Sequence, residues 1–146
     1  MPAWPAVDIA AGVLESIVGA AHDARPRECC GLLIGTRARI VGAFPAANLA
    51  VAPTRYDIAP ADHFAALRAA RAAGLEVVGC YHSHPHGPAR PSPTDRLEAV
   101  ADFLYLIVGL GESPPDLGLW VLADGNFAPV RLVRTEGAGE GPPGGR

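Results

Sequence analysis

The sequence predicts one domain of the α/β class (α+β type), because it combines segments of helical and of strand character. The chain has 146 residues, 49% of them apolar, which is enough for one hydrophobic core and argues against a second domain. Apolar residues recur at helical spacing in residues 8–24 and 60–74. Mostly apolar runs of strand length occupy residues 29–35, 77–84 and 103–110.

The first part of the chain is expected to form one helix and one hairpin. Asp8 is the expected N-cap of the helix, and Arg25-Pro26-Arg27 would end it. The apolar stripe of this helix consists of Ile9, Val13, Leu14, Ile17, Val18 and Ala21. Residues 29–35 are predicted as a buried strand, with residues 39–44 as its partner across a turn near Thr36-Arg37.

The middle of the chain is expected to hold two more helices. Residues 55–58 are strand-like, and Pro60 then stands at the start of a helix that ends at Gly74. After the strand at 77–84 comes a loop rich in proline and glycine, followed by a short predicted helix from Pro93 to about Val100.

The C-terminal part is expected to form a hairpin and then to lose structure. Residues 117–123 and 127–133 flank Asp124-Gly125, a dipeptide that favours hairpin turns. From residue 135 the chain has almost no apolar residue to bury. We therefore expect a folded domain over residues 1–134 and a disordered tail over 135–146.

Charge and composition narrow the function classes. A net charge of -3 and a pI of about 5.9 give no basic field for a nucleic-acid partner. No apolar run approaches the ~20 residues of a membrane span, and we find no signal peptide. The three cysteines do not form a disulfide framework, so we expect small buried side chains and a cytoplasmic location.

Two histidines at the end of the strand 77–84 are candidate metal ligands. His82 and His84 are two residues apart, so on a strand their side chains project from the same face. Ser92 is the expected N-cap of the following helix and Asp95 lies in its first turn, where its carboxylate is a candidate third ligand. Ser92 and Asp95 also fit a capping box without any catalytic role, and the two interpretations are compatible.

Glu28 is the candidate general base. A zinc ion held by three protein ligands keeps one position open for a water molecule, and hydrolysis also needs a proton acceptor. Glu28 precedes an apolar strand, and such surroundings raise the pKa of a carboxyl group. The alternative, an ordinary solvated glutamate at the end of a strand, stays open at this point.

Together these residues resemble the signature of the JAMM (MPN+) metallopeptidases. The signature joins Glu28, then His82-Ser83-His84-Pro85, then Ser92 and Asp95, and Glu28-Cys29-Cys30-Gly31 is similar to the bacterial branch. The resemblance implies a curved, mixed and mostly antiparallel sheet flanked by helices, related to the cytidine-deaminase fold. It also implies Zn2+ bound by His82, His84 and Asp95, with Glu28 as general acid and base and Ser92 as oxyanion donor.

The implied reaction is hydrolysis of the amide bond after the C-terminal Gly-Gly of a ubiquitin-like or sulfur-carrier protein. Release of cysteine or of a peptide fits a short chain of this kind, and a homodimer is possible. A Cys80–His82 nucleophilic pair, a deaminase and a non-catalytic scaffold are the rival interpretations. The deaminase signature, His-x-Glu with Pro-Cys-x-x-Cys, is missing, whereas every ligand of the JAMM signature is present.

Overall fold

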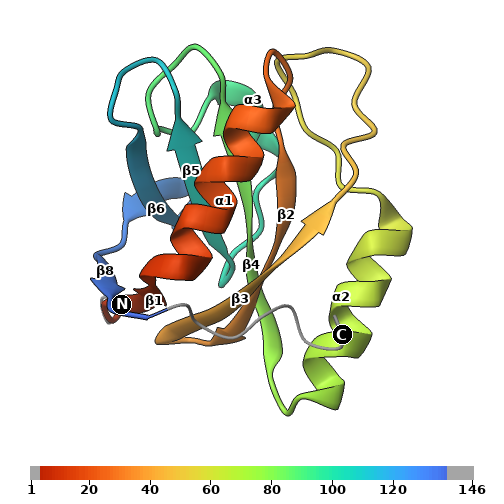
Figure 1. Ribbon diagram of the computed structural model, residues 1–146, viewed down its shortest axis with the longest axis vertical. Helices are drawn as coiled ribbons and strands as arrows, with labels where there is room; N and C mark the ends of the chain where they lie inside the picture. The colour runs from red at the N-terminus through yellow and green to blue at the C-terminus, as the bar shows by residue number, and fades with distance from the viewer. Residues whose placement is uncertain (1–3, 138–146) are drawn as a thin grey trace.

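The structure, a computed structural model, describes residues 4–137 and contains a mixed β-sheet with helices on both faces (Figure 1). In chain order the elements are β1 (Val7–Ala10), α1 (Ala11–Ala24), β2 (Cys30–Thr36), β3 (Arg39–Ala46), α2 (Pro60–Ala72), β4 (Glu76–His84), α3 (Pro93–Glu98), β5 (Leu104–Gly109), β6 (Asp116–Ala123), β7 (Asn126–Pro129) and β8 (Leu132–Thr135).

The eight strands form one sheet in the order β7-β6-β5-β4-β2-β3-β1-β8. β1 runs parallel to β3 and to β8, and β4 runs parallel to β5, whereas the remaining pairs are antiparallel. The two edge strands, β7 and β8, are joined only by Val130 and Arg131, a connection that spans at most about 10 Å. The sheet must therefore curl until its edges approach each other, which confirms the predicted curved, mostly antiparallel sheet.

Both faces of the central strands are buried. On one face α1 places Val13, Leu14 and Ile17 in a core shared with Leu33 and Tyr81. The other face is covered by α2, whose Ala66 and Ala70 pack in a second cluster with Leu32, Ile34 and Cys80. Because alternate residues of β2 and β4 enter different clusters, these strands read as continuous apolar runs rather than as an alternating pattern.

The first helix begins later than predicted. Asp8 is not its N-cap: Asp8 and Ile9 belong to β1, and the helix starts at Ala11 with no side-chain cap at Ala10. All four residues of β1 pair with β8, Asp8 and Ile9 also pair with β3, and Val7 and Ile9 are fully buried there. Backbone pairing on both sides of this short segment thus outweighs the helical spacing of its apolar residues.

The predicted strand at 127–133 is divided between the two ends of the sheet. β7 pairs with β6 as the expected hairpin, but β8 crosses to the far edge and pairs with β1. The backbone N–H of Val130 donates to the carbonyl of Leu119 (2.8 Å), and the N–H of Val7 donates to that of Arg131 (2.9 Å). Residues 127–133 therefore connect the two edges of the sheet, and this connection closes the curl.

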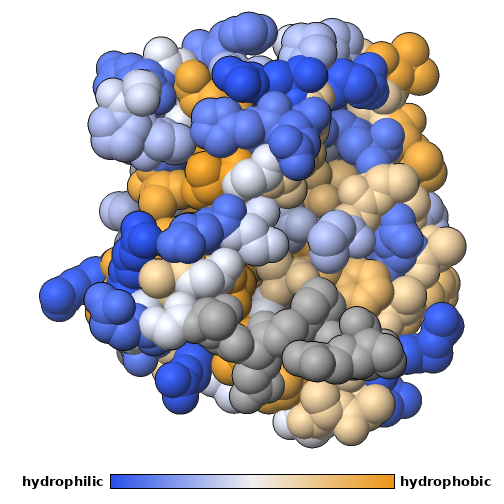
Figure 2. Space-filling model, in the orientation of Figure 1, coloured by the Kyte–Doolittle hydropathy of each residue, from blue (hydrophilic) through white to orange (hydrophobic). Residues whose placement is uncertain are grey.

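Most other predicted elements agree with the structure, but residues 55–58 hold only an isolated bridge from Ile58 and the third helix ends at Glu98. Gly74 follows α2 with a φ of +72°, a value that favours glycine, and α3 begins at Pro93 as predicted. Of the expected tail, Thr135 belongs to β8, and residues 138–146 lie outside the described residues. No helix within residues 4–137 has the length and hydropathy needed to cross a bilayer. Hydrophilic side chains crowd the end of the molecule where α1 finishes and β4 ends (Figure 2).

Candidate metal centre

Three of the predicted residues meet at the C-terminal end of β4. The Nε2 atoms of His82 and His84 lie 3.2 Å apart, and Asp95 Oδ2 lies 3.1 Å from each of them. His82 is fully buried, and Asp95 is 8% exposed. A strand and a short helix, separated by an eight-residue loop, thus direct three potential ligand atoms toward one point.

The position of Asp95 fits both of the roles considered for it. Its backbone N–H donates to Ser92 Oγ (3.0 Å), while its Oδ2 accepts from the backbone N–H of Ser92 (2.9 Å). This capping box holds the carboxylate still, and the same Oδ2 atom faces the two imidazoles. The cap therefore orients the candidate ligand rather than replacing it.

The hydrogen bonds of His84 indicate that this group of atoms fits a cation. His84 Nδ1 lies 2.8 Å from the carbonyl oxygen of Pro88, which can only accept, so Nδ1 carries the proton. The neutral ring then presents a lone pair on Nε2 to Asp95 Oδ2, another acceptor, and a cation between them removes this conflict. Zinc bonds of ~2.0–2.1 Å in a tetrahedron separate ligand atoms by about 3.3 Å, close to the distances observed.

The pKa values describe the same centre when no ion is bound. Burial lowers the pKa of His82. Although burial works against both changes, mutual hydrogen bonding raises the pKa of His84 and holds that of Asp95 well below its usual range. Without an ion, these surroundings therefore favour the protonated form of His84 more than water does.

Glu28 lies beside these residues and is buried, with 6% of its surface exposed. Cys30 of β2 pairs with His82, so extending this register by two residues places Glu28 opposite His84 on the same face. Candidate ligand atoms of Glu28, His82 and His84 lie within 4.8 Å of one another, a looser group than the one formed with Asp95. Glu28 Oε1 is buried and has no hydrogen-bond partner among residues 4–137. Burial raises the pKa of Glu28 to about 7, with His84 opposing and Asp95 adding to the shift.

Ser83 holds the backbone that carries Glu28. Because side chains alternate along a strand, that of Ser83 projects from the face opposite to His82 and His84. It lies fully buried, and its Oγ accepts from the backbone N–H of Cys29 (2.9 Å). On the other side, Asn48 Nδ2 donates to the carbonyl of Glu28 (3.0 Å). A serine between two ligands on a buried strand needs such a partner, and this was the available sequence signal.

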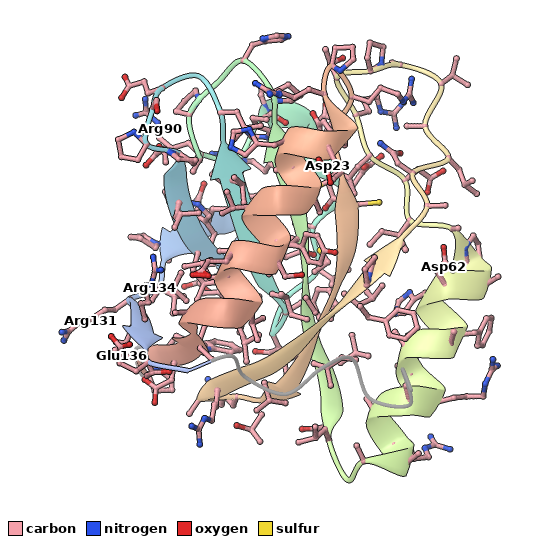
Figure 3. The ribbon with its side chains drawn as sticks, viewed as in Figure 1. Asp23, Asp62, Arg90, Arg131, Arg134 and Glu136 are labelled. Carbon is pink, nitrogen blue, oxygen red and sulfur yellow. The ribbon has the colours of Figure 1, made fainter. Side chains whose placement is uncertain are left out.

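Tyr56 is a further residue that sequence reasoning did not identify. Its ring stacks on His82 at 4.3 Å between centroids and 18° between planes, and its hydroxyl lies 3.8 Å from Cys80 Sγ. Tyr56 belongs to the connection between β3 and α2, in which residues 55–58 contribute only one isolated bridge, from Ile58. Asp62 at the start of α2 fastens this connection by accepting the backbone N–H of Ala47 (2.8 Å; Figure 3).

The cysteines do not form a nucleophilic pair with a histidine. Cys80 is 3% exposed and its sulfur contacts Tyr56, while burial raises the pKa of its thiol to about 12. The pKa of Cys30 is also raised by burial, to about 12. Both side chains therefore stay protonated near neutral pH, and the Cys80–His82 interpretation is wrong.

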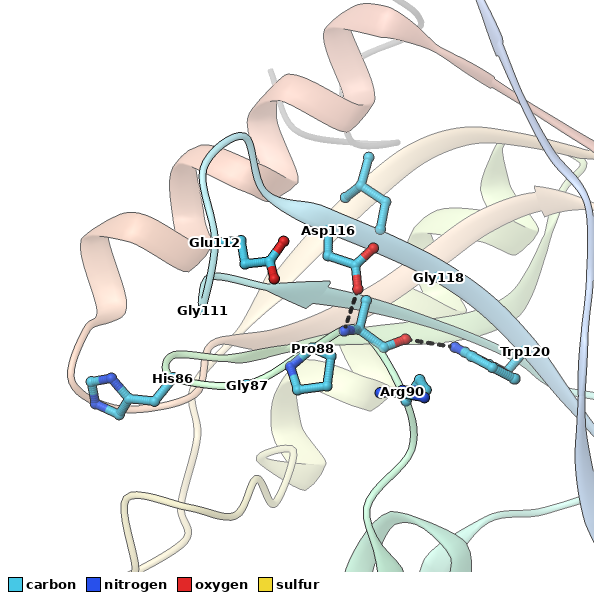
Figure 4. A pocket seen from close by; sticks show the side chains of 11 residues that line it. His86, Gly87, Pro88, Arg90, Gly111, Glu112, Asp116, Gly118 and Trp120 are labelled. Atoms are coloured by element: carbon cyan, nitrogen blue, oxygen red, sulfur yellow. Dashed lines mark hydrogen bonds between the residues drawn. The ribbon is translucent and has the colours of Figure 1, made fainter.

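The candidate site opens into a cavity of about 520 Å³, which Glu28, His84 and Ser92 all line. Its walls come from Pro53 and Thr54 and, in the loop after His84, from residues 85–88, 90 and 91. A second cavity, of about 600 Å³, is also lined by residues 86–90 and reaches the start of β6 (Figure 4). The loop between His84 and Ser92 thus forms part of both cavities.

Comparisons with known proteins agree with this geometry. Residues 10–123 match a family described as prokaryotic homologues of the JAB domain. The chain is 40% identical over 110 residues to the desampylase of Haloferax volcanii, a match that covers 69% of this chain and 78% of that protein. It is 37% identical over 99 residues to a Thermus thermophilus protein named "Probable TtuB-protein conjugate cleaving protease", covering 67% of this chain and 66% of that protein.

A solved structure shows the same fold. The crystal structure of a JAB1/MPN domain protein from Archaeoglobus fulgidus superimposes with a TM-score of 0.58 at 22% identity. The superposition covers 87% of this chain and 99% of that one, so it extends over most of the fold and not over the site alone.

Proposed function

This chain belongs to the prokaryotic JAB-domain family, the JAMM or MPN+ metallopeptidases, and we propose that it is a zinc peptidase acting on conjugates of a ubiquitin-like or sulfur-carrier protein. One observation carries the proposal: His82, His84 and Asp95 present three ligand atoms 3.1–3.2 Å apart. Glu28, which has a raised pKa, lines the same cavity.

The metal would be held by His82, His84 and Asp95. Two imidazoles and one carboxylate suit zinc, and this set leaves a coordination position open. When bound, the ion would supply Lewis acidity, polarising the substrate carbonyl and lowering the pKa of water to about 7. Tyr56 stacks on His82, and the capping box holds Asp95, so the protein orients its ligands before the ion arrives.

Glu28 is the proposed general acid and base. A carboxyl group with a pKa of about 7 can take a proton from the attacking water and then donate it to the leaving amine at neutral pH. The missing hydrogen-bond partner of Oε1 within residues 4–137 leaves that oxygen available for the water. The contacts of Cys29 and Asn48 hold the Glu28 backbone in place on both sides.

Ser92 is the proposed hydrogen-bond donor to the oxyanion. Ser92 Oγ accepts from the N–H of Asp95, and within the described residues its hydroxyl proton has no acceptor. This proton can therefore be donated to a substrate oxygen in the cavity that Ser92 lines. Loss of a donor of this kind lowers turnover by about 10²–10³.

The proposed scissile bond is the amide after the C-terminal Gly-Gly of the carrier, with cysteine, a peptide or a conjugated protein as leaving group. The two similar proteins named above support a protein conjugate as substrate. Pro53, Pro85, Pro88 and Pro91 line the cavity beside Glu28, and a segment of two glycines brings no side chains against these rigid walls.

The test uses purified protein loaded with zinc and a set of carrier proteins that carry C-terminal extensions. We expect mass spectrometry to detect cleavage after Gly-Gly, and Glu28→Gln to keep zinc but to lose turnover. Carriers that stay intact with the zinc-loaded enzyme would contradict the substrate assignment. A chain without stoichiometric zinc would contradict the metal and favour the scaffold interpretation.

A further inference from the structure

The loop between His84 and Ser92 is held by side chains from β6 that lie outside the proposed site. Its three prolines have no backbone N–H, so the loop offers few donors for anchoring. Ala89 is nevertheless 2% exposed, and both of its backbone polar groups are bound by side chains. Asp116 Oδ2 accepts from its N–H (3.0 Å), and Trp120 Nε1 donates to its carbonyl (2.9 Å; Figure 4). We call these three residues the Ala89 clasp.

Two glycines leave the space that the clasp needs. A Cβ atom on Gly109 would lie 2.6 Å from the backbone nitrogen of Ala89. One on Gly118 would lie 2.4 Å from the Ala89 carbonyl oxygen and 2.6 Å from Trp120 Nε1. Any larger residue at either position would therefore push the loop away from β5 and β6.

The clasp acts on His84 through a single peptide unit. The carbonyl oxygen that accepts from His84 Nδ1 belongs to Pro88, and the N–H that donates to Asp116 belongs to Ala89. These two groups are the opposite ends of one planar amide. Asp116 therefore orients the peptide plane that in turn selects the Nδ1–H form of His84 and directs Nε2 toward Asp95. The cavity of about 600 Å³ on this side gives the loop room to move if the clasp is lost.

We propose that Asp116, assisted by Trp120, is a positioning residue that sets the tautomer and the ring orientation of His84 and so increases the affinity for the metal. The inference rests on the proposed function in taking His84 as a ligand. Partners that orient a metal-bound histidine typically change affinity by about 10–100-fold. Because Asp116 is exposed and acts through a peptide unit, we expect about 10-fold, the lower end of this range.

The test compares Asp116→Ala with Asp116→Asn, which keeps an acceptor oxygen, and with Glu112→Ala. Glu112 lines the same cavity, whereas the hydrogen bonds of Ala89 go to Asp116 and Trp120, so Glu112 is a matched control. Zinc affinity is measured by chelator competition. The tautomer of His84 is read from imidazole ¹⁵N shifts in metal-free protein at pH 9, a readout that a merely structural role would not change.

We expect Asp116→Ala to bind zinc about 10-fold more weakly and to lose the Nδ1–H form, while Asp116→Asn and Glu112→Ala stay near the wild type. If Asp116→Ala fails to fold, Trp120→Phe replaces it in the test. This variant keeps an aromatic ring but loses the N–H donor, and it should also bind zinc more weakly. Unchanged zinc affinity together with an unchanged His84 tautomer would overturn the proposal. The tautomer is measured without metal, so this measurement tests the role of the Ala89 clasp even if the wild type binds no zinc. A wild type that binds no zinc would count against the proposed function and not against the clasp.

Discussion

Removing the charge of Glu28 should stabilise the metal-free protein at alkaline pH and leave it nearly unchanged in acid. The pKa of Glu28 is raised from 4.5 to about 7 by burial, so between these values the folded protein binds a proton that the unfolded chain releases. The free energy of unfolding therefore falls as pH rises through this window and is constant above it. Glu28→Gln is neutral at every pH and resembles the protonated carboxyl group.

The size of the effect follows from the same shift. One pKa unit corresponds to about 1.4 kcal/mol, so the full shift would be worth about 3 kcal/mol. Glu28 faces a cavity that admits solvent, and screening there reduces the expected gain to about 1–2 kcal/mol. For a chain of this size, 1 kcal/mol moves Tm by about 3–4 °C, so we expect Glu28→Gln to melt about 3–8 °C above the wild type at pH 8.

The assay is thermal unfolding followed by circular dichroism, with a chelator present, at pH 4.5 and at pH 8. The difference in Tm between the two proteins reports Glu28 together with its coupling to His84 and Asp95, because all other titratable groups are the same in both. A difference that is the same at the two pH values, or a wild type that is the more stable protein at pH 8, would refute the buried and unpaired carboxyl group. If Glu28→Gln is more stable than the wild type but inactive, this would also agree with the general observation that active-site residues often lower the stability of the fold.

Three further substitutions test the other assignments. Asp95→Ala should lower zinc affinity by at least 10-fold in chelator competition, whereas Glu98→Ala on the exposed end of α3 should not, because its ion pair with Arg55 is solvent-exposed; equal zinc retention in both would remove Asp95 from the ligand set. Ser92→Ala should reduce kcat by about 10²–10³ while one zinc per chain is kept, with a loss of about 1 kcal/mol in stability from the missing N-cap; turnover at the wild-type rate would contradict the oxyanion role. Cys80→Ala should retain most of the activity, because its thiol has a pKa of about 12; an inactive but folded and zinc-loaded variant would reopen a role for this cysteine.

Local patterns in the sequence were sufficient to predict which residues meet at the candidate metal centre. The spacing of His82 and His84 places both on one face of any strand, and Ser92-Pro93 with Asp95 starts a helix from short-range contacts alone. Four polar positions and Glu28 together also identified the JAMM family, which the match over residues 10–123 confirms. The similar proteins confirm the metallopeptidase class. These features depend on residues within one turn or one strand, or on a motif whose residues and spacing can be read directly from the sequence.

Only the tertiary structure decided where the remaining groups act. β1 was predicted as part of a helix because its apolar residues have helical spacing. β8 pairs at the opposite edge of the sheet from β7 because the sheet curls. The contact of Ser83 with Cys29 spans 54 positions of sequence, and that of Trp120 with Ala89 spans 31. Backbone propensity and periodicity act over a few residues, whereas such contacts exist only after strands distant in sequence have paired, so no local pattern encodes them.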